Sequence, residues 1–187
     1  MDDAVTMDPR KLAAVVYDLG VAVDELLLVF ARDLATEGVR LGGVIQLPRG
    51  SPGCGPNAPR MLRDVATGET FSICRDLGRG AEDCALNPTA LRHAAGRIRA
   101  AIDSDADLIF VSRFGKEEGR GHGLRRELAR ATFSGCPVLT AVPRGMVHNW
   151  LSLRDGMATM LDAHLWVLKN WWGEIARGGD RVSARVG

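Results

Sequence analysis

The stretch of this sequence best suited to chemistry is a basic, glycine-rich segment. It reads Arg-Phe-Gly-Lys-Glu-Glu-Gly-Arg-Gly-His-Gly-Leu-Arg-Arg over 113–126. Glycines let backbone N–H groups approach a ligand, and guanidinium groups bind tetrahedral oxyanions through paired hydrogen bonds. We therefore expect an anion site here. The expected side-chain contacts are Arg113, Lys116, Arg120 and His122. The expected backbone N–H contacts are Gly115, Gly119 and Gly121.

A second interpretation of this segment stays open. The same cations would then pair with nearby carboxylates in a solvated loop, with Glu117, Glu118 and Glu127 as the partners. A general-base role for His122 would need a nucleophile or a carboxylate beside it, and the sequence places neither there. We therefore expect no catalytic residue in this segment.

The four cysteines suggest another kind of chemistry. They stand at 54, 74, 84 and 136, without the close pairs that a zinc site requires. Thiolates suit molybdenum or another soft metal centre, so Cys54 and Cys84 are secondary candidates for metal ligands. We expect Cys136 to be packed in the core, and no disulfide framework in a chain of this kind.

The turn after the first expected strand is a natural place for a phosphate loop, because it joins a strand to a helix N-terminus. It reads Tyr-Asp-Leu-Gly-Val-Ala-Val-Asp over 17–24. A P-loop needs a lysine for the phosphates and a hydroxyl for magnesium, and this turn has neither. Asp18 and Asp24 oppose an anion, and helix capping explains Asp24. We therefore expect no hydrolysis at this turn.

The elements that must position these residues alternate between strands and helices. Buried apolar runs predict strands at 11–17, 39–47, 107–111 and 137–142. Helical spacing of apolar residues predicts helices at 21–37, from Asn87-Pro88 onward, and at 124–133. A turn at Gly68 predicts a hairpin of 60–65 with 69–74. The remainder of the chain, 144–187, is expected to be helical.

This order predicts an α/β fold in three layers, with an open, mostly parallel sheet and an inserted β-hairpin. We expect a single domain over 1–187, with 144–187 as a helical extension packed on it. The first two strands and their helix form a β-α-β unit, which predicts a parallel pair. Ligands bind beyond the carboxyl ends of such strands, so the segments 18–24, 112–123 and 143–149 should converge.

Composition limits the classes of partner. The chain has 24 Lys and Arg against 23 Asp and Glu, so its net charge of +1 gives no reason to expect nucleic acid or an anionic membrane. No apolar run reaches the roughly 20 residues of a membrane helix, and the N-terminus lacks a signal-peptide pattern. We expect a cytoplasmic protein without membrane insertion.

Four tryptophans lie in the C-terminal part of the chain, at 150, 166, 171 and 172. Their clustering predicts a C-terminal helix docked on the core. The alternative is an interface, because tryptophan is enriched where proteins bind each other. In that case Trp171 and Trp172 would hold a partner or a second copy of the chain in a homodimer.

The order of elements, the hairpin around 64–69 and Phe-Gly-Lys-Glu-Glu at 114–118 resemble a small family of P-loop nucleoside triphosphatases. The resemblance implies a P-loop-like fold. That family has a glycine-rich phosphate turn and a later acidic segment that handles magnesium and water. When Gly115 and Glu118 are aligned, the acidic pair falls on Ser112 and Arg113, so catalytic roles do not transfer.

The chain resembles more closely an uncharacterised bacterial family, a domain of unknown function whose members often carry the name of a molybdenum transporter ATP-binding protein. The resemblance runs from about Leu12 to Val142. It rests on Val-Tyr-Asp at 16–18, Asp-Leu-Gly at 76–78 with Cys84 and Leu86, and Arg-Phe-Gly-Lys-Glu-Glu at 113–118. Family members usually have Asn at the position of Ser112 and a Cys-Asp-Met segment in place of the insert around Cys54.

Together these features predict a degenerate P-loop-like domain that binds a small anionic ligand, either an oxyanion or a nucleotide, without hydrolysis. The family resemblance implies molybdate or tungstate as the oxyanion, with phosphate as the general case. One alternative is a nucleoside triphosphatase or nucleotide transferase with an unconventional site. The other is an interaction protein that acts through its tryptophan-rich C-terminus.

Overall fold

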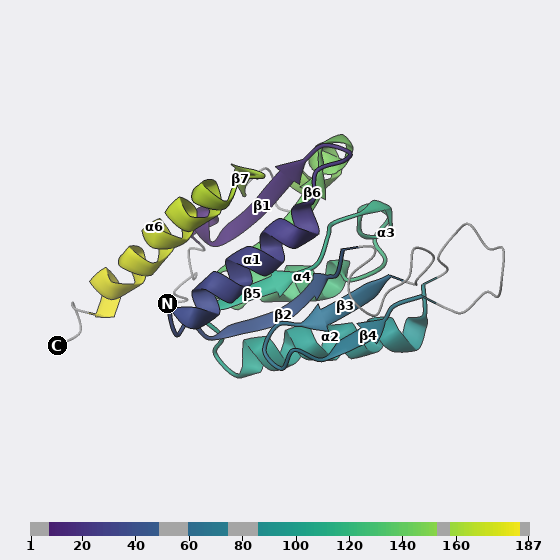
Figure 1. Ribbon diagram of the computed structural model, residues 1–187, viewed down its shortest axis with the longest axis horizontal. Coiled ribbons are helices and arrows are strands. Elements are labelled where there is room, and N and C mark those ends of the chain that lie inside the picture. The colour runs from purple at the N-terminus through teal and green to yellow at the C-terminus, as the bar shows by residue number, and fades with distance from the viewer. Residues whose placement is uncertain (1–7, 49–59, 75–85, 153–157, 184–187) are drawn as a thin grey trace, which may run out of the picture.

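The computed structural model describes residues 8–48, 60–74, 86–152 and 158–183. Within these residues seven strands form one sheet in the order β4-β3-β2-β5-β6-β1-β7 (Figure 1). The strands are β1 (Leu12–Tyr17), β2 (Leu41–Gln46), β3 (Met61–Asp64), β4 (Thr70–Ser72), β5 (Leu108–Val111), β6 (Val138–Pro143) and β7 (Thr159–Asp162). All neighbours pair in parallel except β2 with β3 and β3 with β4. The mostly parallel sheet with an inserted hairpin is therefore confirmed.

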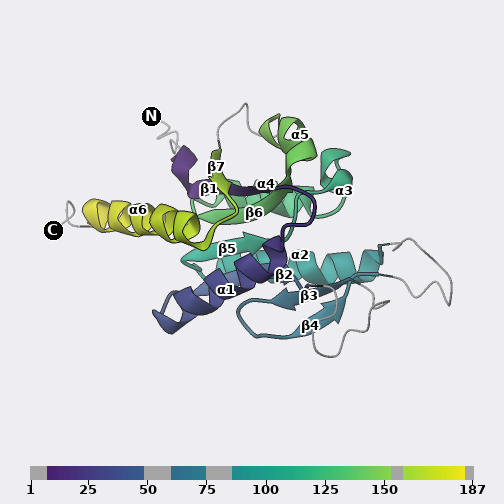
Figure 2. The same ribbon diagram turned by 45° about the horizontal axis from the view of Figure 1, so that its top comes forward.

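Helices cover both faces of this sheet (Figure 2). On one face α1 (Val23–Thr36) and α6 (Leu165–Ser183) bury their apolar residues, and on the other face α2 (Pro88–Asp103) and α4 (Arg125–Phe133) do so. The short elements are α3 (Lys116–Gly119), α5 (Val147–Leu151) and the 3-10 turns η1 (Pro9–Lys11) and η2 (Arg144–Met146). Helices, sheet and helices form the three predicted layers.

The helix boundaries follow from local chemistry. At the start of α2 the Asn87 side chain accepts a hydrogen bond from the backbone N–H of Thr89, at 2.9 Å, and Pro88 occupies the first helical position. After α1, Gly38 takes a positive φ of 82°, and its N–H donates to the carbonyl of Ala35. These are the start and stop signals that the sequence contains.

The prediction of a parallel pair between the first two strands is wrong. β1 and β2 run in the same direction, but β5 and β6 lie between them. All four residues of β5 are buried, as are five of the six residues of β6. Strands that are apolar on both sides are most stable at the centre of a sheet that is covered on both faces. The central position of β5 and β6 therefore separates β1 from β2.

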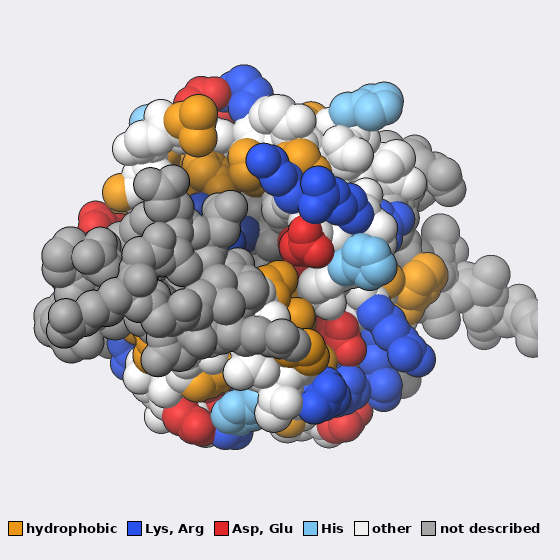
Figure 3. Space-filling view, turned by 90° about the vertical axis from the view of Figure 1, so that its right-hand side faces the viewer, with side chains coloured by type: hydrophobic (Ala, Val, Ile, Leu, Met, Phe, Trp, Pro, Cys, Tyr) orange, Lys and Arg blue, Asp and Glu red, His pale blue; other side chains and the backbone are white. Residues whose placement is uncertain are grey.

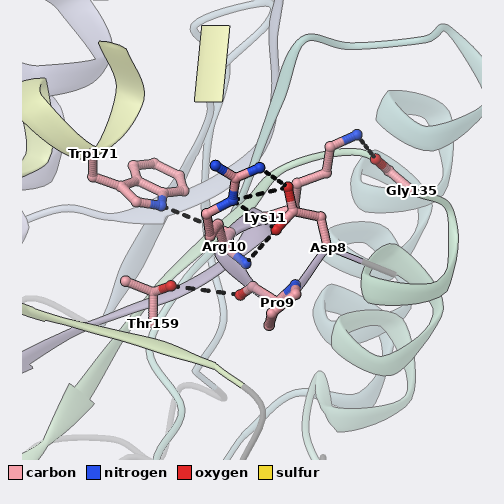
Figure 4. Close-up of polar contacts among 7 residues, drawn as sticks. All are labelled: Asp8, Pro9, Arg10, Lys11, Gly135, Thr159 and Trp171. Carbon is pink, nitrogen blue, oxygen red and sulfur yellow. Dashed lines mark hydrogen bonds and ion pairs between the residues drawn. The ribbon is translucent and has the colours of Figure 1, made fainter. Parts of the chain in front are cut away.

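The C-terminal region differs from the all-helical extension that we expect, because it contributes β7 to the sheet, parallel to β1. The docking of α6 is confirmed: Leu168 and Trp171 are buried in the same cluster as β1. Figure 4 shows the attachment at the amino end of β1, where the indole N–H of Trp171 donates to the carbonyl of Arg10 at 2.8 Å. Lys11 donates from its ammonium to the carbonyl of Gly135 at 2.9 Å. Among the described helices, none is both long and apolar enough to cross a membrane.

Candidate functional site

The three segments that we expect to converge do so at the carboxyl end of the sheet. Arg144, at the start of η2, donates to both carboxylate oxygens of Asp18, at 2.7 and 3.1 Å. Gly119 in α3 lies against η2, since a Cβ built on it would be 2.6 Å from Cε of Met146. Figure 3 faces the side of the molecule where α3 lies, and shows basic, acidic and histidine side chains close together there. We call this surface the carboxyl-end face.

A partly buried ion pair joins the first of these segments to the second. Arg113 follows β5, and its Nε donates to Oδ1 of Asp24 in the first turn of α1, at 2.9 Å. The Nη2 of Arg113 donates to the other carboxylate oxygen. Asp24 is only 5% exposed, and Gln46 at the end of β2 also donates to it, at 3.2 Å. Burial opposes the charge of Arg113, but the bonds to Asp24 prevail and raise the pKa of the guanidinium.

This arrangement corrects the expected role of Asp24. The residue at the N-cap of α1 is Ala22, and Asp24 lies inside the first turn, where its carboxylate binds Arg113. The carboxylate of Asp24 thus lies in the first turn of the helix that follows β1, where it is paired with Arg113.

The glycine-rich segment is also organised around its own carboxylate. Glu118 accepts a hydrogen bond from the N–H of Gly115 at 2.9 Å and another from the N–H of Leu124 at 3.0 Å. The N–H of Gly119 donates to the carbonyl of Gly115, and the N–H of Gly121 donates to the carbonyl of Glu118. All three backbone groups expected to hold an anion thus bond within the segment. In this conformation these three N–H groups are not free to bind an anion, whereas side chains of the segment are.

Three of the expected cations remain on the surface. Lys116 and His122 are exposed, and neither side chain has a partner among the described residues. Arg120 forms an exposed ion pair with Glu117, at 3.1 Å, as the solvated-loop interpretation predicts. Surface pairs of this kind contribute about 0–1 kcal/mol, so a multivalent anion can displace the carboxylate. Arg113 differs from these three, because its charge is matched by Asp24.

Two residues of this face were missed by the sequence reasoning. The phenol oxygen of Tyr17 accepts a hydrogen bond from Nη1 of Arg113 at 3.3 Å, and the guanidinium lies 5.4 Å from the ring centre. Burial raises the pKa of Tyr17, against the opposing effects of Arg113 and Arg60. Arg60, just before β3, is exposed at the same end of the sheet. The Val-Tyr-Asp motif was the signal for Tyr17, whereas no local pattern marks Arg60.

The cysteines give no metal site within the described part of the chain, where no cluster of three or more His, Cys, Asp or Glu could hold an ion. Cys54 and Cys84 lie outside the described residues. Cys136 is free and partly buried against the core, and its thiol donates to the carbonyl of Ala106 at 2.8 Å. Cys74 is disulfide-bonded, whereas the sequence predicts no disulfide framework.

The tryptophans divide between core and surface. Trp150 is 2% exposed and packs edge-on against Phe114, with ring centres 5.3 Å apart. Trp171 in α6 is buried against the sheet, and Trp172 next to it is partly buried. Trp166 alone among the four has most of its surface exposed, at 66%. A homodimer contact through Trp171, the alternative left open by the sequence, would therefore require α6 to leave the core.

Comparison with known proteins gives one relative by sequence and one protein of similar fold. The chain is 39% identical over 174 residues to the molybdenum import ATP-binding protein ModC 2 of Bradyrhizobium diazoefficiens. That alignment covers 93% of this chain but 19% of the relative, so the chain spans about a fifth of the relative's length. The fold is similar to that of a human cancer-related nucleoside triphosphatase solved in solution, with a TM-score of 0.55 and 17% identity. That match covers 80% of this chain and 88% of the other chain, and it concerns the fold alone.

Both resemblances expected from the sequence are thus confirmed. A family model also matches residues 12–171, which include every described strand and the first part of α6. Because this match spans most of the sequence, the chain belongs to the family described as "Protein of unknown function (DUF2478)".

Proposed function

We propose that this chain is a P-loop-like domain that binds a small oxyanion, or the phosphate group of a nucleotide, and does not hydrolyse nucleotides. The binding residues are Lys116, Arg120 and His122 on the carboxyl-end face. The observation that carries the proposal is which charged side chains on this face already have partners within the protein. Buried Asp24 and half-buried Glu118 have partners inside the protein, whereas Lys116 and His122 have none among the described residues.

The absence of hydrolysis follows from the position of Asp24. In P-loop enzymes the first turn of this helix binds the phosphates, and a lysine and a magnesium ion neutralise the charge that develops during transfer. Here a carboxylate that is 5% exposed occupies that turn. A second anion beside it would have to overcome like-charge repulsion in a poorly solvated place. Phosphoryl transfer at this turn is therefore disfavoured.

The name of the curated relative supports molybdate or tungstate as the first ligand to test. That protein is named for molybdenum import and ATP binding, and this chain is similar to about a fifth of its length. We infer that the matching segment recognises the transported oxyanion. Molybdate and tungstate are tetrahedral dianions, so two or three converging cations suit them better than a single cation does.

A thermal-shift panel with Mg-ATP, Mg-GTP, phosphate, sulfate, molybdate and tungstate tests the proposal. A ligand at about 100 times its Kd adds roughly 2.7 kcal/mol of stability, which raises the melting temperature of a domain of this size by several degrees. We expect molybdate or tungstate to give the largest shift, and no magnesium-dependent release of phosphate from ATP. Hydrolysis of ATP, or no shift with any anion, would contradict the proposal.

A further inference from the structure

Tyr17 is the one tyrosine in the sequence, and it ends strand β1 at the carboxyl-end face. Its ring is buried, at 7% exposed, while its phenol group lies where β1 meets the turn before α1. A phenol can accept a hydrogen bond and donate one at the same time. The oxygen of Tyr17 accepts from Nη1 of Arg113 at 3.3 Å, and among the described residues nothing accepts its proton.

Arg113 is held in place from the opposite side. Its Nε and Nη2 are both used by the carboxylate of Asp24, which leaves Nη1 for the phenol oxygen. A partly buried pair of this kind loses solvation on folding and is stabilised by these hydrogen bonds. Arg113 therefore orients the phenol of Tyr17.

Arg60 adds a positive charge beside this group. It precedes β3, whose Leu62 pairs with Gln46, and Gln46 in turn donates to Asp24. The side chain of Arg60 is exposed and has no partner among the described residues. The charged groups close enough to the phenol to act on it are Arg60, Arg113 and the carboxylate of Asp24. The balance is one net positive charge, which is complementary to an anion.

We propose that Tyr17 is a ligand-contacting residue of the carboxyl-end face, donating its phenol proton to the bound oxyanion while Arg60 supplies charge beside it. This inference rests on the proposed function and extends it toward the centre of the sheet. In this arrangement the Asp24–Arg113 ion pair positions the phenol of Tyr17. It also predicts that a bound anion lies between the phenol of Tyr17 and the cations of the glycine-rich segment.

The test uses the full chain with molybdate, the variants Tyr17→Phe and Arg60→Ala, and the control Thr36→Val. Tyr17→Phe keeps the ring beneath Arg113 and removes only the hydroxyl. Thr36→Val removes an exposed hydroxyl at the far end of α1. A hydrogen bond to a charged group predicts about a tenfold loss of affinity for Tyr17→Phe, and Arg60→Ala should lose a similar amount. Thr36→Val should bind like the unaltered chain.

A second measurement distinguishes a direct contact between Tyr17 and the anion from a purely structural role of Tyr17. Because the chain has one tyrosine, ¹³C-labelled tyrosine gives NMR signals from Tyr17 alone. We expect molybdate to shift these signals at neutral pH, with the same midpoint as binding measured by calorimetry. If the chain binds molybdate through Lys116 and Arg120 but the Tyr17 signals do not move and Tyr17→Phe binds normally, this inference is wrong and the proposed function stands. If the unaltered chain binds no anion, both are wrong.

Discussion

The carboxylate of Glu118 lies directly against the α-carbon of Gly123. A Cβ built on Gly123 would be 2.1 Å from Oε1 of Glu118, far inside van der Waals contact. Gly123 also has a positive φ of 61°, which side-chain-bearing residues rarely adopt. The last glycine of the basic segment thus makes room for an anionic group that the chain itself provides. The glycine-rich segment is thus shaped around the carboxylate of Glu118, which it binds without any ligand.

Substitution of Gly123→Ala should therefore displace Glu118. We expect the free energy of unfolding to fall by about 2–3 kcal/mol, because the backbone at position 123 becomes strained and the hydrogen bonds from Gly115 and Leu124 to Glu118 are lost. Urea denaturation measures it. Gly121→Ala is the matched control, because Gly121 also has a positive φ but open space around it. It should lose only about 1 kcal/mol. Equal losses in the two variants would show that Glu118 does not depend on Gly123.

Replacing Arg113→Met should destabilise the fold strongly. The change leaves Asp24 buried and without its cation, for which about 3–5 kcal/mol is expected. The double variant Asp24→Asn with Arg113→Met removes the orphaned charge, so its loss should be clearly smaller than that of Arg113→Met alone. Chemical denaturation of the three proteins gives the comparison. A double variant that is less stable than Arg113→Met would contradict the pairing.

Thr140→Val should stabilise the protein. Thr140 lies in β6 with no exposed surface, and its hydroxyl has no hydrogen-bond partner among the described residues. Valine keeps the branched shape that suits a strand and removes the unsatisfied polar atom. A gain of about 1 kcal/mol is expected, visible as a higher melting temperature. A loss of stability instead would mean that the hydroxyl is hydrogen-bonded in solution.

The thiol of Cys136 should make the fold sensitive to alkaline pH. Burial raises its pKa from 9.0 to about 11. Below pH 9 the thiol is protonated in both states, whereas between pH 9 and 11 the unfolded chain loses a proton that the folded chain keeps. Stability should therefore fall as the pH rises through this window, by about 1–2 kcal/mol once partial exposure is allowed for. Denaturation at several pH values measures the decline, which Cys136→Ser should reduce, since serine does not titrate there. An equal fall in stability with pH in Cys136→Ser and in the unaltered chain would show that the Cys136 thiol is not the cause.

Much of the fold could be predicted from local patterns. The strands at 11–17 and 137–142 and the helices at 21–37 and 124–133 match β1, β6, α1 and α4 within a few residues. Each has apolar spacing and a clear start or stop signal. β7 was missed because it has four residues, of which only Leu161 is buried. The order of the strands was also missed, because periodicity shows which residues are buried and not which strands are neighbours.

The location of the site could be predicted from the sequence, but the contacts between its residues could not. Topology alone brings the segments at 18–24, 112–123 and 143–149 together. The partner of Arg113 is 89 residues away in sequence, and no local pattern links it to Asp24. The role of Glu118 did have a signal. It lies three residues after Gly115, the spacing at which a glutamate reaches back to the N–H that precedes a helical turn.

We propose that exposed side chains of the glycine-rich segment, among them Lys116 and Arg120, bind an anion. Isothermal titration of molybdate into the unaltered chain and into Lys116→Ala with Arg120→Ala tests it most directly. The control, Arg32→Ala with Arg130→Ala, removes the same charge from exposed positions farther along α1 and α4. We expect the first double variant to lose about 100-fold in affinity, from two charged contacts, and the control to bind normally. Equal affinity in all three proteins would contradict the account.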